Sequence, residues 1–339
     1  MNIVHLDQRT QAWLEWRKNG VTASEAAVIL GLSPYKTLWR LWAEKCGIAK
    51  PEDLSRNPYV RHGIEYEDVA RREFERRHPG ELALPLCGES KKHPVMRASF
   101  DGIISARRPV EIKCPCRSVF EKVKRERENS EGYKLYLPQV QHQMCVSGAT
   151  EGYLFFWHHD EEPVEFLIKR DDALIDELIM KSNEFAKMVK TRKAPEKDPQ
   201  RDVWVPKGRK AELWASAAEV VKESVAEMQK LSERLKELET AKKKAETELI
   251  SLMGSYYNAE YDGVRITRFH RSGAVDYSAL LRDHAPHIGE ELLDSYRKEG
   301  TEQHRITVSD SSLPDWLVDA QFEREIEKIK QARNEDLFF

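Results

Sequence analysis

The sequence predicts a mixed α/β domain followed by a long helix and a small α+β region. Helical and strand-like patterns alternate over residues 1–193, a proline- and charge-rich stretch follows at 194–210, and apolar residues then recur at heptad spacing over 211–254. The alternation indicates a central mixed sheet flanked by helices. The chain therefore divides into an N-terminal domain, a linker, a coiled-coil-like helix and a region at 255–339 whose role the sequence leaves open.

Hydrophobic periodicity places the elements of the N-terminal domain in order. Helices are expected near 8–19, 23–31, 37–46, 63–77, 117–126, 138–147 and 171–191. Strands are expected near 95–105, 109–114, 151–158 and 164–170. Thr22 and Glu25 have the spacing of a capping box at the second helix, and Pro138 is expected to begin the sixth.

The long helix has two apolar rows at heptad spacing, which Lys242 and Ser224 interrupt. The rows contain Trp214, Val221, Met228, Leu235 and Leu249, and Ala217, Leu231, Leu238, Ala245 and Leu252. Such a helix needs a partner, either the protein's own C-terminal elements or the same helix of another subunit, and the sequence leaves both possible. Beyond it, the pair Asp262–Gly263 predicts a hairpin turn, and a charged helix is expected near 319–333.

Composition excludes several classes of protein. No apolar run approaches the roughly 20 residues of a membrane-spanning helix, and the N-terminus lacks the pattern of a secretory signal, so a soluble, cytoplasmic protein is expected. Five cysteines, an odd number, fit reduced thiols better than a disulfide framework. The net charge of −3 argues against a broadly basic surface, so any nucleic-acid contact must use local patches.

The residues with the clearest chemical potential are Asp101, Glu111 and Lys113. Asp101 is expected just after one strand, and Glu111 and Lys113 lie on the next, where alternation points both to one face and Ile112 to the core. Carboxylate oxygens suit Mg²⁺ or Mn²⁺, and a lysine can orient water or stabilise charge on a phosphodiester. Chance alone supplies about five acid-x-Lys triplets in such a composition, so the apolar neighbours of Glu111 carry the prediction of a buried metal site.

A second candidate site is an anion site at the capped helix that begins after Thr22. Ser24 lies in its first turn, and Arg17 is one helix earlier, so free backbone N–H groups and a guanidinium could hold a phosphate. An ordinary capped helix with a surface arginine explains the same residues. Glu67, on an amphipathic helix, and Gln139, in a helical first turn, are weak candidates by themselves.

Taken in order, five short motifs resemble the phage lambda exonuclease and YqaJ-type recombination nuclease family, within the PD-(D/E)xK nuclease fold. The resemblance covers about residues 8–190. The motifs are W-x-x-x-R with TASE (Trp13, Arg17, Thr22 to Glu25), G-x-x-Y-E (Gly63 to Glu67), S-x-D-G (Ser99 to Gly102), E-I-K-C-P (Glu111 to Pro115) and Q-V-Q (Gln139 to Gln141). By this resemblance, residues 1–193 are a PD-(D/E)xK nuclease domain.

The resemblance also implies a role for each candidate residue. Asp101, Glu111 and the backbone carbonyl of Ile112 would bind catalytic Mg²⁺, for which Mn²⁺ could substitute, and Glu67 would support a second metal. Lys113 and Gln139 would position the attacking water. The 5′-phosphate would be held by Arg17, Ser24 and Ser99.

The activity implied is Mg²⁺-dependent 5′-to-3′ digestion of one strand of linear double-stranded DNA to mononucleotides, which leaves a 3′ overhang for a single-strand annealing partner. A homo-oligomer, a trimer by the same resemblance, is also implied. The extension of about 140 residues departs from the short lambda-type enzymes and puts the subunit interface in doubt. Alternatives are an endonuclease on the same fold, a DNA-end-binding scaffold with a vestigial site, and a coiled-coil interaction protein.

Overall fold

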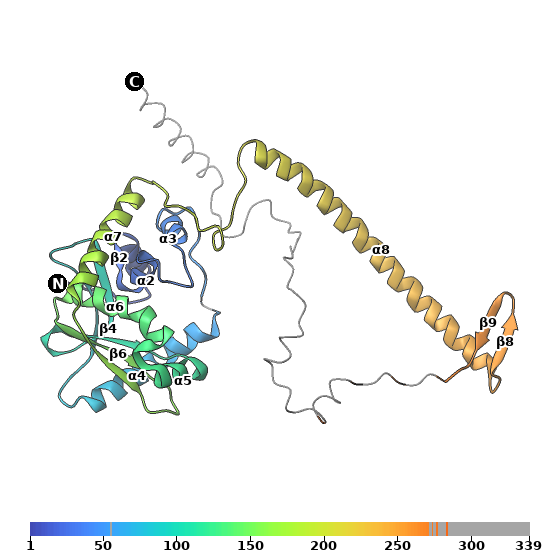
Figure 1. Ribbon diagram of the computed structural model, residues 1–339, viewed down its shortest axis with the longest axis horizontal. Helices are drawn as coiled ribbons and strands as arrows, with labels where there is room; N and C mark the ends of the chain where they lie inside the picture. The colour runs from blue at the N-terminus through green and yellow to red at the C-terminus, as the bar shows by residue number, and fades with distance from the viewer. Residues whose placement is uncertain (55, 271–272, 274–275, 277–282, 284–339) are drawn as a thin grey trace, which may run out of the picture. The chain divides into compact units, whose positions relative to one another are not determined.

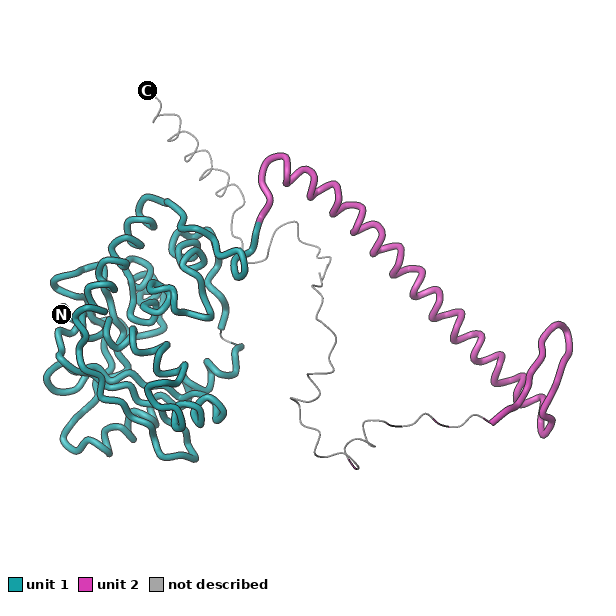
Figure 2. The backbone as a smooth tube through the Cα atoms, in the orientation of Figure 1, with its two compact units in different colours: residues 1–204, 311–339 teal, residues 205–310 magenta. Residues whose placement is uncertain are grey.

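The structure is a computed structural model that describes residues 1–54 and 56–270, with 273, 276 and 283. Its described part divides into two compact units, one running from Met1 to Trp204 and the other beginning at Val205 (Figure 2). All residues of the predicted site lie in the first unit.

A seven-stranded mixed sheet forms the centre of the first unit (Figure 1). Its strands are β1 (Asn2–Val4), β2 (Val21–Thr22), β3 (Leu84–Glu89), β4 (Met96–Ile103), β5 (Pro109–Lys113), β6 (Glu151–Phe156) and β7 (Val164–Lys169). The order is β1-β3-β4-β5-β6-β7, with β2 beside β4; the β2–β4 and β5–β6 pairs are parallel and the others antiparallel. The predicted mixed sheet is confirmed. Strands β1 to β3 were not predicted, because two are very short and the third contains Pro85 and Gly88.

The helices of this unit follow the prediction with a few differences. They are α1 (Gln11–Lys18), α2 (Ala26–Ile29), α3 (Leu38–Lys45), α4 (Pro58–Arg77), α5 (Arg117–Glu126), α6 (Glu131–Ser147) and α7 (Asp172–Lys190), with 3₁₀ turns at Ala23–Glu25, Ser105–Arg107 and Arg127–Asn129. The expectation that Pro138 begins a helix is wrong: the Ser130 side chain caps α6 by accepting from Tyr133 N at 3.2 Å, and Pro138 lies inside. The second predicted helix is split into a 3₁₀ turn and α2.

Helices cover both faces of the sheet. Along β6, Tyr153 and Phe155 pack with Phe74 of α4, whereas Leu154 and Phe156 pack with Met144 of α6 on the opposite face. Burial on both faces explains why β6 is an almost continuous apolar run. The neighbouring β5 is enclosed in the same way, so any polar side chain on it enters the interior.

The chain beyond α7 remains attached to this unit through contacts with the α3 region. Thr37 Oγ1 donates to Asp202 Oδ1 at 2.6 Å, and the ammonium of Lys197 lies 4.0 Å from the Trp39 ring centroid. Arg201 also donates to the carbonyl of Ser33 at 2.9 Å. The first part of the predicted linker is therefore fixed to the domain.

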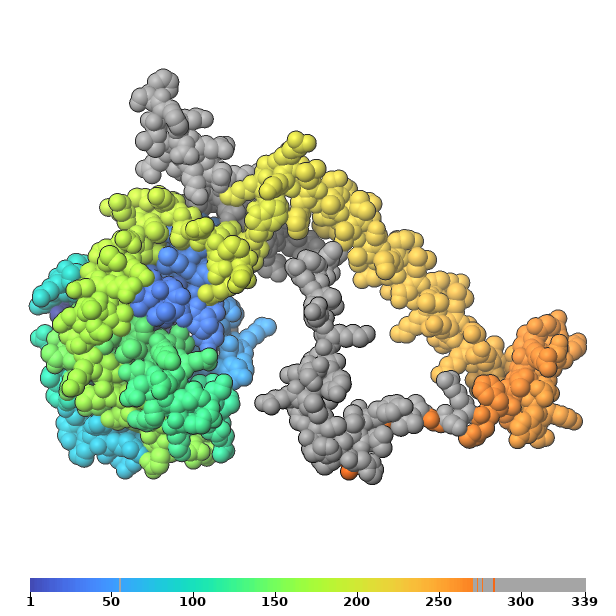
Figure 3. All heavy atoms as spheres, in the orientation of Figure 1, coloured from blue at the N-terminus to red at the C-terminus, as the bar shows by residue number. Residues whose placement is uncertain are grey.

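The second unit contains one long helix, α8 (Arg209–Met253), and a hairpin of β8 (Asn258–Tyr261) and β9 (Val264–Thr267). Asp262 and Gly263 both have positive φ, as a tight hairpin turn requires, so that prediction is confirmed. Met253 is the one buried residue of α8 in the described part of the chain, and Figure 3 shows the side chains on one face of this helix. No described helix combines the length and apolar character needed to span a membrane. The helix expected near 319–333 lies outside the described residues.

Candidate active site

Asp101 lies inside β4, at a β-bulge. The pairing of β3 with β4 shifts register between Leu84 and Leu86, so that Asp101 and Gly102 together face Pro85. The strand expected near 95–105 is confirmed as β4, but the expectation that Asp101 comes just after a strand is wrong, because β4 continues to Ile103. Its Oδ2 accepts a hydrogen bond from the backbone N–H of Ile112, at 2.9 Å, across the gap to β5.

Glu111 is buried in β5 next to α6, with 1% of its surface exposed. Its Oε1 accepts from Lys113 Nζ and from Gln139 Nε2, each at 2.6 Å, and its Oε2 accepts from Gln143 Nε2, also at 2.6 Å. The two glutamines are four residues apart, so one face of α6 presents both. Side-chain donors therefore hold both oxygens of the Glu111 carboxylate in place.

Asp101, Glu111 and the ammonium of Lys113 share this interior, and the pKa values of Asp101 and Lys113 are shifted as a result. Burial and then the charge of Glu111 raise the pKa of Asp101 well above its ordinary value. Burial alone would lower the pKa of Lys113, but the nearby carboxylates, Glu111 first, raise it above its ordinary value. Lys113 is therefore a held cation, 4.3 Å from the Tyr136 ring centroid, and is not a base at neutral pH.

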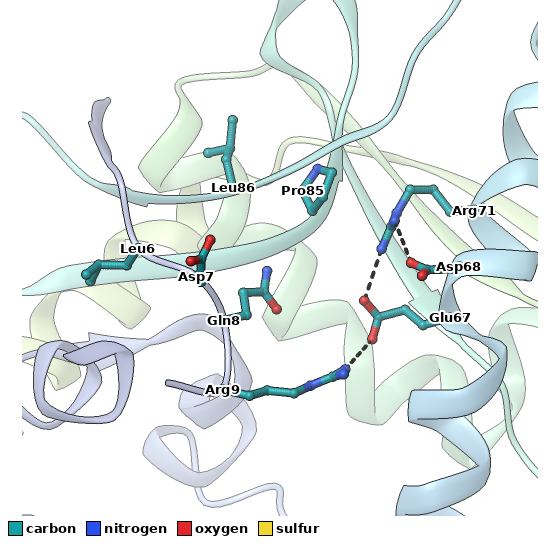
Figure 4. Close-up of a pocket in the computed structure, with 9 residues that line it drawn as sticks. All are labelled: Leu6, Asp7, Gln8, Arg9, Glu67, Asp68, Arg71, Pro85 and Leu86. Carbon is teal, nitrogen blue, oxygen red and sulfur yellow. Dashed lines mark hydrogen bonds and ion pairs between the residues drawn. The ribbon is translucent and has the colours of Figure 1, made fainter. Parts of the chain in front are cut away.

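Glu67 approaches the same centre from α4 and is held by two arginines (Figure 4). Arg71 donates to its Oε1 at 3.1 Å, and Arg9 donates to its Oε2 at 2.9 Å. These three residues line a pocket of about 250 Å³ with Asp7, Gln8 and Asp68 and the apolar Leu6, Pro85 and Leu86. Glu67 contributes to the raised pKa of Asp101, so the two carboxyl groups lie within electrostatic reach.

The candidate phosphate ligands form a second cluster beside β4. Arg17 donates to Ser24 Oγ at 2.8 Å, and its guanidinium lies 4.4 Å from the Trp13 ring centroid. Trp13 Nε1 in turn donates to Ser99 Oγ at 2.7 Å. Glu25 closes the turn by accepting from Thr22 N at 2.9 Å. The structure therefore brings Arg17, Ser24 and Ser99 together through Trp13.

Strand β4 contributes one residue to each of the two clusters: Ser99 to the candidate phosphate site and Asp101 to the carboxylate site. Ser99 and Asp101 are two residues apart on β4, which at the usual strand rise of ~3.3 Å per residue separates their Cα atoms by about 7 Å. That distance is comparable to the spacing of adjacent phosphates along a nucleic-acid strand. A phosphate held at Ser99 would place its neighbour near Asp101.

Several residues of the site were missed from sequence alone. Gln143 follows Gln139 at a four-residue interval, a signal that was available but needs the start of α6 to be placed correctly. Arg71 lies four residues after Glu67, the ordinary spacing of a helical ion pair, and nothing in the sequence marks its contact with β4. The role of Trp13 depends on a contact 86 residues away and has no local signal.

A group of His158, His159 and Asp160 also brings potential metal ligands within 4.8 Å of one another. The two imidazole rings are stacked with centroids 4.4 Å apart, and His159 Nε2 lies 2.9 Å from Asp160 Oδ2. Near-parallel rings do not direct their nitrogens at one point. Ring stacking and the His159–Asp160 contact account for this group.

The carboxylate centre, by contrast, has the donors that a hard divalent cation requires. Asp101 and Glu111 supply oxygen ligands, and their mutual repulsion in a buried place is the kind that a cation relieves. The N–H of Ile112 faces Asp101, and the carbonyl of a strand residue points to the same edge as its N–H, so the Ile112 carbonyl faces this centre too. The residues present fit a divalent metal.

Two curated proteins are similar to part of the chain. The protein YqaJ of Bacillus subtilis (strain 168), which is uncharacterized, is 30% identical over 178 residues, covering 51% of this chain and 54% of YqaJ. The uncharacterized protein R354 of Acanthamoeba polyphaga mimivirus is 29% identical over 103 residues, covering 30% of this chain and 18% of R354. The chain thus spans about half the length of the first relative and less than a fifth of the second.

Among solved structures, an alkaline exonuclease from Laribacter hongkongensis is similar, with a TM-score of 0.45, 24% identity, and coverage of 54% of this chain and 94% of that one. A phage-related exonuclease from Haemophilus somnus has a TM-score of 0.38, 16% identity, and coverage of 51% and 96%.

Residues 12–150 match the model of the YqaJ-like viral recombinase domain. This range contains every predicted site residue, from Arg17 to Gln139, and Gln143 as well. Residues 12–150 of this chain are therefore a YqaJ-like viral recombinase domain.

Proposed function

We propose that this protein is a divalent-metal-dependent deoxyribonuclease that digests one strand of linear double-stranded DNA from its 5′ end. The observation that supports it best is that two clusters meet the same strand: Arg17 and Ser24 lie near Ser99, and paired carboxylates with a lysine lie at Asp101. The first cluster suits a terminal phosphate and the second suits phosphodiester hydrolysis.

In this proposal Asp101, Glu111 and the Ile112 carbonyl hold Mg²⁺, for which Mn²⁺ can substitute, and Glu67 supports a second ion. A bound divalent ion would activate water and neutralise charge on the phosphodiester. Lys113 and Gln139 now share Glu111 Oε1, and both can instead donate to the attacking water or to a phosphate oxygen. Because Lys113 is held as a cation, it stabilises developing negative charge and does not remove the proton.

The end recognised and the product are linked by the chemistry. Water adds to the phosphorus and the bond to the leaving 3′ oxygen breaks, which releases a mononucleotide with a 3′-hydroxyl and leaves a new 5′-phosphate on the shortened strand. Arg17 and Ser24 would therefore meet the same group after each cut. Repeated cuts leave a 3′ overhang, the substrate of a single-strand annealing protein, which we propose as a partner. We also propose a homo-oligomer, a trimer by family resemblance, to which α8 could contribute its open apolar row.

A linear duplex with one 5′-phosphate end and one 5′-hydroxyl end tests this function. The protein is incubated with this duplex and with a closed circle, in Mg²⁺ or in EDTA, beside an Asp101→Ala preparation. We expect metal-dependent mononucleotide release from the phosphorylated end, none from the circle and none by the variant. Cutting of the circle would identify an endonuclease, and binding of ends without any hydrolysis would favour the scaffold alternative.

A further inference from the structure

At the β-bulge around Asp101, backbone carbonyls of β4 accept hydrogen bonds from side chains of other elements. Pro85, which faces the bulge, has no N–H to donate. Arg71 Nε donates to the Asp101 carbonyl at 2.9 Å, and Gln8 Nε2 donates to the Phe100 carbonyl at 3.1 Å. The conformation of the strand at the catalytic aspartate therefore depends on side chains of α4 and of the N-terminal segment.

Arg71 spreads its guanidinium over three acceptors. Besides the Asp101 carbonyl, it donates to Glu67 Oε1 at 3.1 Å and to Asp68 Oδ1 at 2.8 Å. The Arg71 side chain is 16% exposed and that of Glu67 22%, so the bond between them is largely shielded from water, whereas Asp68 is 69% exposed. A guanidinium is planar and rigid, and thus each acceptor is fixed relative to the others.

We propose that Arg71 is a positioning residue that sets the separation of Glu67 on α4 from Asp101 on β4, and so shapes the metal centre. This rests on the proposed function, in which these two carboxylates are metal ligands. Arg71 reaches Glu67 through its side chain but Asp101 through its backbone, so it leaves the Asp101 carboxylate available to a cation.

Arg9 also donates to Glu67, but its side chain is far more exposed than that of Arg71. It makes one bond to Glu67, its side chain is 50% exposed, and its backbone has a φ of 71°. It lies at the rim of the pocket, where an incoming phosphate could draw it away from Glu67 (Figure 4). Arg71 is the fixed contact of Glu67, and Arg9 is the exchangeable one.

Mn²⁺ binding to the full-length, DNA-free protein, measured by calorimetry and by the loss of free Mn²⁺ signal in electron paramagnetic resonance, tests this inference. We expect Arg71→Gln to weaken Mn²⁺ binding by roughly 10- to 100-fold, the usual effect of losing a group that orients metal ligands. Arg71→Lys keeps the positive charge but loses the planar set of guanidinium donors, so its Mn²⁺ affinity should lie between those of the parent and Arg71→Gln. The matched control is Arg72→Gln, an exposed position on the same helix, which should bind as the parent does.

Thermal unfolding without metal separates positioning from folding. Weakened Mn²⁺ binding by an Arg71→Lys protein that unfolds at the parent's temperature supports positioning, even where Arg71→Gln does not fold. Parental Mn²⁺ affinity in a folded Arg71→Gln protein overturns the inference, as does a parent that binds no Mn²⁺. If Arg71 variants lose Mn²⁺ affinity while the parent hydrolyses no DNA, the positioning role stands and the proposed nuclease function fails.

Discussion

The two units of this chain differ in how far their apolar side chains are buried. In the first unit, apolar side chains of the central strands are buried between α4 on one face and α5 to α7 on the other. In the second unit, α8 has 45 residues, of which only Met253 is buried, and Leu231, Leu235 and Leu238 are more than half exposed. An apolar pattern whose side chains are buried within the chain specifies a fold, whereas an apolar pattern that stays exposed indicates a binding partner.

The largest expected effect is in the first unit, at Asp101. Asp101→Asn should lower nuclease activity by roughly a thousandfold or more, because a lost metal ligand removes several kcal/mol of charge stabilisation. The same variant should unfold at a higher temperature than the parent in EDTA at neutral pH, because it removes a carboxyl group whose charged form is destabilised by burial and by the charge of Glu111, the two causes of its raised pKa.

Calorimetry in EDTA and in Mg²⁺ checks both parts of this prediction. Mg²⁺ should raise the unfolding temperature of the parent and leave that of the variant unchanged. An Asp101→Asn protein stabilised by Mg²⁺ as strongly as the parent would remove Asp101 from the metal centre.

A fully buried histidine gives the first unit a predictable acid sensitivity. Burial lowers the pKa of His142 to about 4, while its value in an unfolded chain is about 6.5. As the pH falls from 6.5 to 4, the unfolded chain takes up a proton that the folded chain refuses, so stability is lost over that window, by roughly 3 kcal/mol in total.

Urea unfolding of the parent and of His142→Gln at pH 7 and pH 4 measures this loss. The glutamine amide can replace the contact of His142 Nε2 with the Arg97 carbonyl, which is 3.0 Å, without titrating. We expect the variant to lose roughly 3 kcal/mol less than the parent between the two pH values. Equal losses would assign the acid sensitivity to other groups.

End recognition should depend on Arg17. Arg17→Ala removes a charged donor to the phosphate and should reduce the preference for 5′-phosphate over 5′-hydroxyl ends by roughly 10- to 100-fold, the equivalent of one charge-assisted hydrogen bond. Initial rates on the two kinds of end give the ratio. Lys18→Ala, the next residue and exposed, is the control and should keep the parental ratio. A parent that degrades both ends equally would contradict this role.

The smallest effect on folding is expected in the second unit. Leu235→Glu should change the unfolding free energy of the first unit by no more than about 0.5 kcal/mol, whereas Leu154→Ala in β6 should cost about 2–5 kcal/mol.

Oxidation of a Leu235→Cys variant distinguishes the two possible partners of α8. A covalent dimer of Leu235→Cys indicates that the partner of α8 is the same helix of another subunit, provided that neither the parent nor Glu233→Cys, a control away from the apolar rows, forms such a dimer. Monomers throughout favour a partner within the chain.

Local patterns predicted much of the fold and part of the site. Alternation along β5 was enough to place Glu111 and Lys113 together and Ile112 in the core, because strand geometry fixes those directions. Alternation could not show the bulge at Asp101, which depends on Pro85 in a strand that the pattern did not reveal. Nor could it place Arg71 against β4 or Trp13 against Ser99, because those contacts join residues 30 and 86 positions apart.

Gly102, which follows Asp101 in the β-bulge, restricts how the sequence can vary. A Cβ at Gly102 would lie 2.7 Å from the Cβ of Ala83, which is itself buried, so the two positions divide one fixed volume between them. Gly102→Ala alone would push the bulge, and with it Asp101, away from its neighbours. Among relatives, side-chain size at these two positions should therefore vary inversely, and a chain with alanine at the first should carry glycine at the second.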